Sequence, residues 1–202
     1  MARKERFSKG RLMRPNFFVF CEGDTEMTYV QMLRSHYRLP IHIIAKKTVQ
    51  NITPALVERC KASYVQTASD RTYLMYDLDV PEMLERLQKV SGAELLCSNP
   101  CFELWLLLHY KGVKAILTSD SCVKKLTDIV KQYKKGTITA ETAQHLKDNF
   151  SKAAERAKTL HAYDNPSTTV FLLIEELERM KEAETKNNAA AKEQIRKVTD
   201  RF

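Results

Sequence analysis

Acidic side chains stand directly after two apolar segments of this chain, at spacings that suit metal chemistry. Glu22 and Glu26 lie one helical turn apart after the first segment, and Asp77 and Asp79 end the other segment, two residues apart. A carboxylate next to a buried strand is costly unless a cation compensates it. Because hard cations bind carboxylate oxygens, we predict that Asp77, Asp79 and Glu22 bind Mg²⁺ or Mn²⁺.

The glutamates near these aspartates are candidates for proton transfer. A hydrolytic metal site needs a proton acceptor and open positions for water and phosphate. Glu22 suits the acceptor as well as a metal ligand. Glu26 and Glu103, which each fall in the first turn of a predicted helix, are further catalytic candidates. An acid in a first turn is also explained by the helix dipole, so both explanations stay open.

Alternating strands and helices in the first half of the chain would position these residues. Apolar runs with β-favouring residues predict strands at 17–21, 41–45, 72–76 and 93–97. Apolar stripes and start signals predict helices that begin at Gly23, Pro54 and Pro81, and a fourth over 102–109. This alternation is typical of a parallel sheet with helices on both faces.

The topology of such a sheet decides whether the acidic clusters meet. Ligands bind beyond the carboxyl ends of the strands, where both clusters fall. If the strand order begins 2-1-3, the first and third strands are neighbours and Glu22 meets Asp77 and Asp79. Residues two apart in an extended segment point the same way, with Cα atoms about 6–7 Å apart. We therefore expect both aspartates to reach one metal ion or a close pair.

The second half of the chain is predicted to be helical. Helices are expected at 121–133, at 140–160 and from Pro166, with Asn165 as the N-cap of the last. We divide the chain into a basic arm over 1–15, an α/β core over 16–112 and a helical extension over 113–202 packed on that core. His109 and Trp105 are predicted core residues, and Ser167 and Thr168 suit a helix start that can also receive a phosphate.

The charge distribution points to a polyanionic partner. The formal charge is +8, from 33 Lys and Arg against 25 Asp and Glu. Six positive side chains near the N-terminus form an arm that either lies along nucleic-acid phosphates or is a solvated tail: Arg3, Lys4, Arg6, Lys9, Arg11 and Arg14. A second basic stretch is more typical of the solvated face of an amphipathic helix: Lys124, Lys125, Lys131, Lys134 and Lys135.

The cysteines and the hydropathy indicate a reduced, cytoplasmic protein with no membrane partner. The five cysteines are odd in number and scattered, and the chain shows neither a secretory signal nor an apolar stretch long enough to cross a membrane. Cys97 and Cys101 lack zinc-finger spacing, so small buried residues explain them better than a metal site.

Four motifs together resemble the RloB-like proteins, a bacterial group with a Toprim-type core. They are the turn Cys21 to Glu26, the pair Asp77-x-Asp79, the segment Ser98 to His109, and the segment Asn165 to Thr169. The resemblance implies four parallel strands with flanking helices, Glu22 as a general acid or base, and Asp77 and Asp79 as magnesium ligands. It also favours a site role for Glu103 and Asn99.

The resemblance also implies a function. Toprim proteins break or join phosphodiester bonds, and RloB-like proteins are associated with restriction loci and abortive infection, sometimes beside an ATPase. No tyrosine stands out as a topoisomerase nucleophile. We therefore expect a Mg²⁺-dependent nuclease that hydrolyses DNA or RNA in phage defence, with an AAA- or ABC-type ATPase as a candidate partner.

Two alternatives remain. A noncatalytic nucleic-acid-binding or regulatory subunit of an ATPase-containing complex would keep the fold without cutting. Haloacid-dehalogenase-type phosphatases also end an apolar strand with Asp-x-Asp. Their motif usually follows the first strand and continues with a small pair, whereas here it follows the third strand and continues with Val80-Pro81. The phosphatase is therefore the less favoured alternative.

Overall fold

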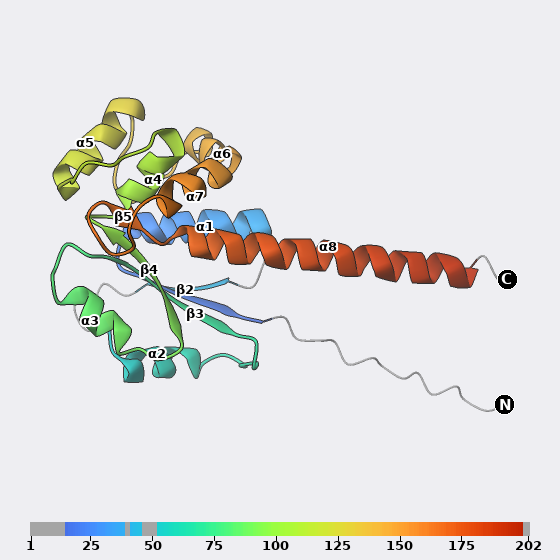
Figure 1. Cartoon of the computed structure of the whole chain (residues 1–202). Coiled ribbons are helices and arrows are strands. Elements are labelled where there is room, and N and C mark those ends of the chain that lie inside the picture. Colours follow the sequence, from blue (N-terminus) through green and yellow to red (C-terminus); the bar gives the residue numbers. More distant parts are fainter. Residues whose placement is uncertain (1–14, 39–40, 46–51, 200–202) are drawn as a thin grey trace, which may run out of the picture.

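A five-stranded sheet forms the centre of the molecule in the computed structural model, which describes residues 15–38, 41–45 and 52–199 (Figure 1). Its strands are β1 (Phe17–Cys21), β2 (Ile41–Ala45), β3 (Arg71–Asp77), β4 (Ala93–Asn99) and β5 (Ser167–Thr168). They lie in the order β2-β1-β3-β4-β5. The predicted adjacency of the first and third strands is confirmed, and so are the four parallel strands of the predicted α/β fold.

The sheet is mixed rather than wholly parallel, because β5 pairs antiparallel with β4. We had expected a helix to start at Pro166, and that prediction is wrong. The Thr168 hydroxyl lies 2.9 Å from the Ser98 hydroxyl, and the Thr169 hydroxyl accepts from the backbone N–H of Cys97 at 2.9 Å. These hydroxyls therefore stabilise an added sheet edge, and the last helix, α8 (Phe171–Thr199), begins later.

Asn165 does not cap that last helix. Its side-chain amide donates to the backbone oxygen of Leu117 at 2.7 Å and accepts from the Leu117 N–H at 3.0 Å. This residue therefore joins two loops instead of starting a helix.

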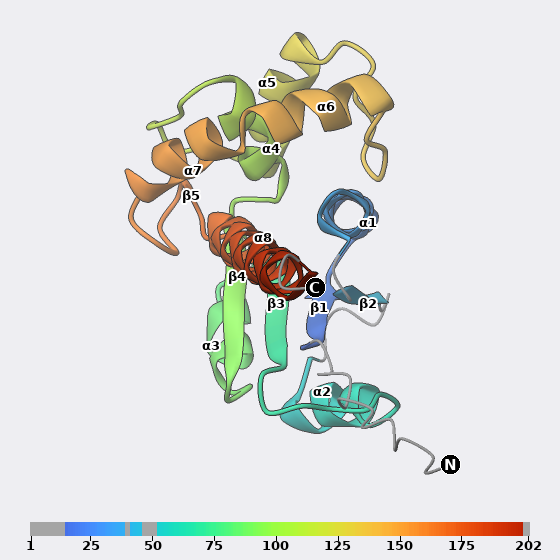
Figure 2. The ribbon, with the colours of Figure 1, turned by 90° about the vertical axis from the view of Figure 1, so that its right-hand side faces the viewer.

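Helices cover both faces of the sheet. The helices α1 (Asp24–Tyr37) and α8 lie side by side on one face, and α2 (Pro54–Lys61) and α3 (Met83–Gln88) lie on the other (Figure 2). The Tyr37 hydroxyl at the end of α1 donates to Glu178 of α8 at 2.5 Å. The helix α2 begins at Pro54 as predicted, and Thr53 caps it, because the Thr53 hydroxyl accepts from the Leu56 N–H at 3.2 Å. None of the helices in the described ranges is both long and apolar enough to cross a membrane.

A further helical layer lies over α1. It contains α4 (Glu103–Tyr110), α5 (Ser119–Ile129), α6 (Ala140–Asp148) and α7 (Phe150–Lys158) (Figure 1). Two predictions of helix length are wrong here. The helix expected over 121–133 ends at Ile129, and the helix expected over 140–160 is interrupted at Asn149, whose φ of −121° and ψ of 16° are not helical.

The helix α4 is the centre of this layer, since every residue from Glu103 to His109 is buried. Trp105 is a core residue, as predicted. His109 is also buried as predicted, and its Nδ1 lies 2.9 Å from the Trp105 carbonyl oxygen. Burial lowers the pKa of His109 to about 4, so its ring is neutral at pH 7.

Candidate functional site

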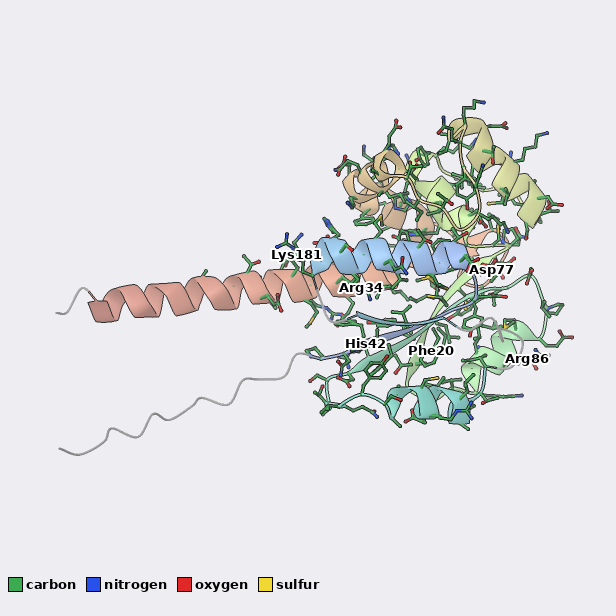
Figure 3. The ribbon with its side chains drawn as sticks, turned by 180° about the vertical axis from the view of Figure 1, so that it is seen from behind. Phe20, Arg34, His42, Asp77, Arg86 and Lys181 are labelled. Carbon is green, nitrogen blue, oxygen red and sulfur yellow. The ribbon has the colours of Figure 1, made fainter. Side chains whose placement is uncertain are left out.

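The carboxyl ends of β1 and β3 bring two of the predicted site residues together. The strands pair in parallel with Cys21 opposite Met75, so that Glu22, the next residue, follows β1 close to the end of β3 and its side chain reaches Asp77. The backbone N–H of Asp77 donates to Glu22 Oε2 at 2.8 Å. Figure 3 shows Asp77 close to the first turn of α1, which carries Glu26. The order of the strands thus produces the convergence that the sequence predicted.

These residues open into a small acidic pocket. The pocket has a volume of about 250 Å³, and five acidic residues line it: Glu22, Asp24, Glu26, Asp77 and Glu103. Lys135 and Gly136 complete its wall. Asp79 is exposed and does not line the pocket, although its charge acts on Glu22 and Asp77. The two aspartates that we predicted as a ligand pair therefore differ in position, because Asp77 lines the pocket and Asp79 does not.

The crowding of these acids raises their pKa values. Burial, followed by the charges of Glu26, Glu22, Glu103 and Asp79, raises the pKa of Asp77 well above its usual range. Burial raises the pKa of Glu26 to about 7, with help from the charges of Glu103 and Glu22 and against its own backbone N–H and Lys135. A pocket of this kind favours protons or cations.

The pKa of Glu22 is also raised, although its causes oppose one another. Burial raises its pKa, the hydrogen bond from the Asp77 N–H acts to lower it, and the charge of Asp79 acts to raise it. That hydrogen bond holds one carboxylate oxygen of Glu22 in place.

Glu103 belongs to this site rather than only to the start of its helix. Tyr133 donates a hydrogen bond from its hydroxyl to Glu103 Oε1 at 2.7 Å, and the Thr25 hydroxyl lies 3.5 Å from the same oxygen. Lys135 Nζ lies 3.8 Å from Glu103 Oε2. The side chain is only 3% exposed and is held from three sides.

Lys135 was not identified from the sequence as a site residue. We took it for the solvated face of a helix, but α5 ends at Ile129 and Lys135 lies in a tight turn. The N–H of Thr137 donates to the carbonyl of Lys134 at 3.0 Å, and Gly136 takes a φ of 78°. Partial burial acts to lower the pKa of Lys135, but Glu103 and the other acids raise it overall. The signal available in the sequence was Gly136, which is typical of such a turn.

Hydrogen bonds attach this turn to the start of α1. The Gly136 N–H donates to the Thr25 hydroxyl, and the Thr28 hydroxyl donates to the Gly136 carbonyl, both at 2.9 Å. A Cβ at Gly136 would lie 3.1 Å from Asp24 Cβ, so a glycine fits this close approach. A Cβ at Gly23 would lie 2.8 Å from Glu26 Oε2, so the flexible end of the Glu26 side chain would have to move.

The remaining candidates from the sequence lie elsewhere. The Asn99 side chain donates to the Tyr163 carbonyl at 3.0 Å, which joins the end of β4 to the loop before β5, outside the acidic pocket. Ser167 and Thr168 are buried in β5. The six basic residues of the N-terminal arm lie outside the described residues.

The donor set suits a hard divalent cation in its chemistry. The pocket offers carboxylate oxygens, and Asp77 Oδ1 is buried without a hydrogen-bond partner. Within the described residues, however, no three His, Cys, Asp or Glu side chains stand close enough together to hold a metal ion as they are. The pocket therefore has ligands for a cation without being a ready-made coordination shell.

The Glu26→Gln variant is expected to lose a pH dependence of stability. Because the pKa of Glu26 rises from 4.5 to about 7 on folding, the folded state keeps a proton that the unfolded state releases. The free energy of unfolding of the metal-free parent should fall by about 3 kcal/mol at most as the pH rises through this range. Denaturant unfolding in EDTA measures it, with the exposed Glu85→Gln as control. If the free energy of unfolding depended on pH equally in the parent and in Glu26→Gln, the raised pKa of Glu26 would be contradicted.

The fold and the pocket define an α/β protein with an acidic site at the carboxyl ends of its central strands. The model of the RloB-like protein family matches residues 17–177, which include every residue of this pocket. The chain therefore belongs to the RloB-like family, as its motifs indicated. Comparisons with curated proteins and with solved structures gave no significant match.

Proposed function

We propose that this protein is a Mg²⁺- or Mn²⁺-dependent nuclease of the Toprim type that hydrolyses DNA or RNA. The observation that carries the proposal is the pocket itself, in which five acidic residues meet beyond adjacent parallel strands with one lysine against them. Membership of the RloB-like family supports a role in bacterial phage defence, in the cytoplasm and with an ATPase as a candidate partner.

In this proposal Asp77 and Glu22 hold the cation, and Asp79 contributes through its charge, which acts on both of them. The bound metal would supply a Lewis acid and an activated water for attack on phosphorus. The N–H of Asp77 fixes one oxygen of Glu22, which leaves the other oxygen for a ligand or a proton. The unpartnered Oδ1 of Asp77 supports its role as a ligand.

Proton transfer and charge balance fall to the other residues of the pocket. Glu26, with a pKa of about 7, can both hold and release a proton near neutral pH, as a general acid or base requires. Lys135 places a positive charge where the phosphate would enter, and Glu103, held by Tyr133, keeps that charge in position.

A noncatalytic nucleic-acid-binding or regulatory subunit is the second candidate. It is favoured by one observation, namely that the carboxylates do not form a ready-made metal site within the described residues. A subunit of this kind would bind nucleic acid in an ATPase-containing complex and would never cut it.

A cleavage screen separates the two candidates. Purified protein is incubated with duplex DNA, single-stranded DNA and transfer RNA, with Mg²⁺, Mn²⁺ or EDTA, and with Glu22→Gln as the control variant. The proposed nuclease cuts at least one substrate in a metal-dependent manner, and the control cuts it far more slowly. Binding without cleavage of any substrate would favour the regulatory subunit.

The basic arm is proposed to bind phosphates, and its deletion tests this role. Removing residues 2–14 is expected to weaken nucleic-acid binding for all sequences and to reduce the slope of log K against log salt by about 0.9 per lost phosphate contact on duplex DNA. Thermal stability should barely change, because β1 begins at Phe17. An unchanged salt slope would show that the arm is only a solvated tail.

A further inference from the structure

A second pocket adjoins the acidic one. It has a volume of about 370 Å³ and lies between the end of α4, the segment after α5, and α6. Its volume falls within the usual range of about 300–1,000 Å³ for small-molecule sites. Nothing in the proposed hydrolysis uses this pocket.

One tyrosine and one turn separate the two pockets. Tyr133 lines the second pocket, and its hydroxyl donates to Glu103, which lines the acidic pocket. In the adjoining turn, Lys135 and Gly136 line the acidic pocket and Thr137 lines the second. A group bound in the second pocket is therefore an immediate neighbour of a group bound at the carboxylates.

The second pocket has aromatic and polar walls. The rings of Tyr110 and His145 stack with their centroids 4.1 Å apart and their planes 8° apart, and both residues line the pocket. Gln132 and Glu141 offer hydrogen-bonding groups at its edge, and the exposed Lys131 adds a positive charge. Flat rings with polar groups around them are the surroundings that a nucleobase takes in protein sites.

We propose that this pocket binds one unpaired nucleobase of the nucleic-acid substrate, next to the phosphate that enters the acidic pocket. The position of that phosphate rests on the proposed function. A base enters by extending the aromatic stack of Tyr110 and His145, and Lys131 contacts the backbone beside it. Bases inside a duplex are already paired and stacked, so the preferred substrate class is single-stranded nucleic acid or an unpaired loop.

The test is a binding measurement that does not depend on cleavage. A short fluorescent single strand and a strand of the same length with abasic nucleotides are titrated with the full chain in EDTA, and the ratio of the two affinities is the preference for bases. Two variants probe the pocket: His145→Ala removes half of the stack, and Thr137→Met fills the cavity from an exposed position. The exposed His161→Ala is the matched control, since His161 lies outside the pocket.

The parent and the His161→Ala control should prefer the strand with bases, and both pocket variants should lose about tenfold of that preference. Melting curves identify a variant that does not fold, in which case the other variant decides. No preference in the parent, or full preference in any folded pocket variant, would overturn the proposal. This test is independent of the proposed nuclease activity. A protein that prefers strands with bases but never cuts would contradict the nuclease proposal and leave the proposal for this pocket intact.

Discussion

The Glu22→Gln protein is expected to cleave nucleic acid about 100-fold more slowly than the parent, or slower still. Glutamine has the size of glutamate, and its amide oxygen can still accept the hydrogen bond from the Asp77 N–H, which spans 2.8 Å in the parent. The fold and the substrate contacts should therefore persist. What is lost is a carboxylate that can accept a proton or bind a metal.

Single-turnover rates and binding affinities together test this role. The rate of the chemical step should fall while the affinity for nucleic acid changes little, because the substitution acts mainly in the transition state. The exposed Glu94→Gln, on β4 and outside the pocket, is the matched control and should cleave like the parent. Equal rates for Glu22→Gln and the parent would exclude proton transfer by Glu22, and the metal assignment to Asp77 would remain.

The Asp77→Asn variant is expected to lose Mn²⁺ affinity by about 100-fold or more, equivalent to about 3 kcal/mol. Asp77 lines the pocket with a carboxylate oxygen that has no hydrogen-bond partner, whereas Asp79 is exposed and does not line it. Asp79→Asn should therefore weaken binding less. Without metal, Asp77→Asn should raise the melting temperature at neutral pH, because a buried and repelled carboxylate is gone.

Isothermal titration calorimetry with Mn²⁺ measures both variants. In the parent, affinity should increase with pH, because burial and the neighbouring acids raise the pKa of Asp77 and a protonated carboxylate must lose its proton to bind. Undiminished binding by Asp77→Asn would refute the assignment. A larger loss in Asp79→Asn than in Asp77→Asn would place the metal outside the pocket.

The sequence was sufficient to predict the meeting of Glu22 and Asp77. Each follows a buried strand, and a doubly wound sheet leaves few orders for those strands, so the two residues had to fall at one edge. The apolar run around Trp105 likewise predicted a buried helix. In both cases a periodic pattern and the general rules of sheet topology decide the outcome.

The positions of Lys135 and β5 could not be predicted in this way, because they depend on long-range contacts that leave no periodic pattern in the sequence. The turn that holds Lys135 lies where Thr25 and Thr28 bind Gly136, residues more than a hundred positions away in the sequence. The two residues of β5 are too few for any alternation, and their pairing with β4 is stabilised by a hydroxyl contact with Ser98. The positions of such short segments are decided by residues that are distant in the sequence, so the local sequence alone does not reveal them.

The docked turn also sets an order of events during synthesis. Glu22 and Asp77 leave the ribosome early, but the lysine and the tyrosine that hold Glu103 follow about 30 residues after it. Among the described residues, one of the two apolar core clusters contains side chains from both sides of residue 112. A partly synthesised chain therefore carries the acids without the residues that position Glu103, and the site is complete only after the turn has been translated and has docked on α1.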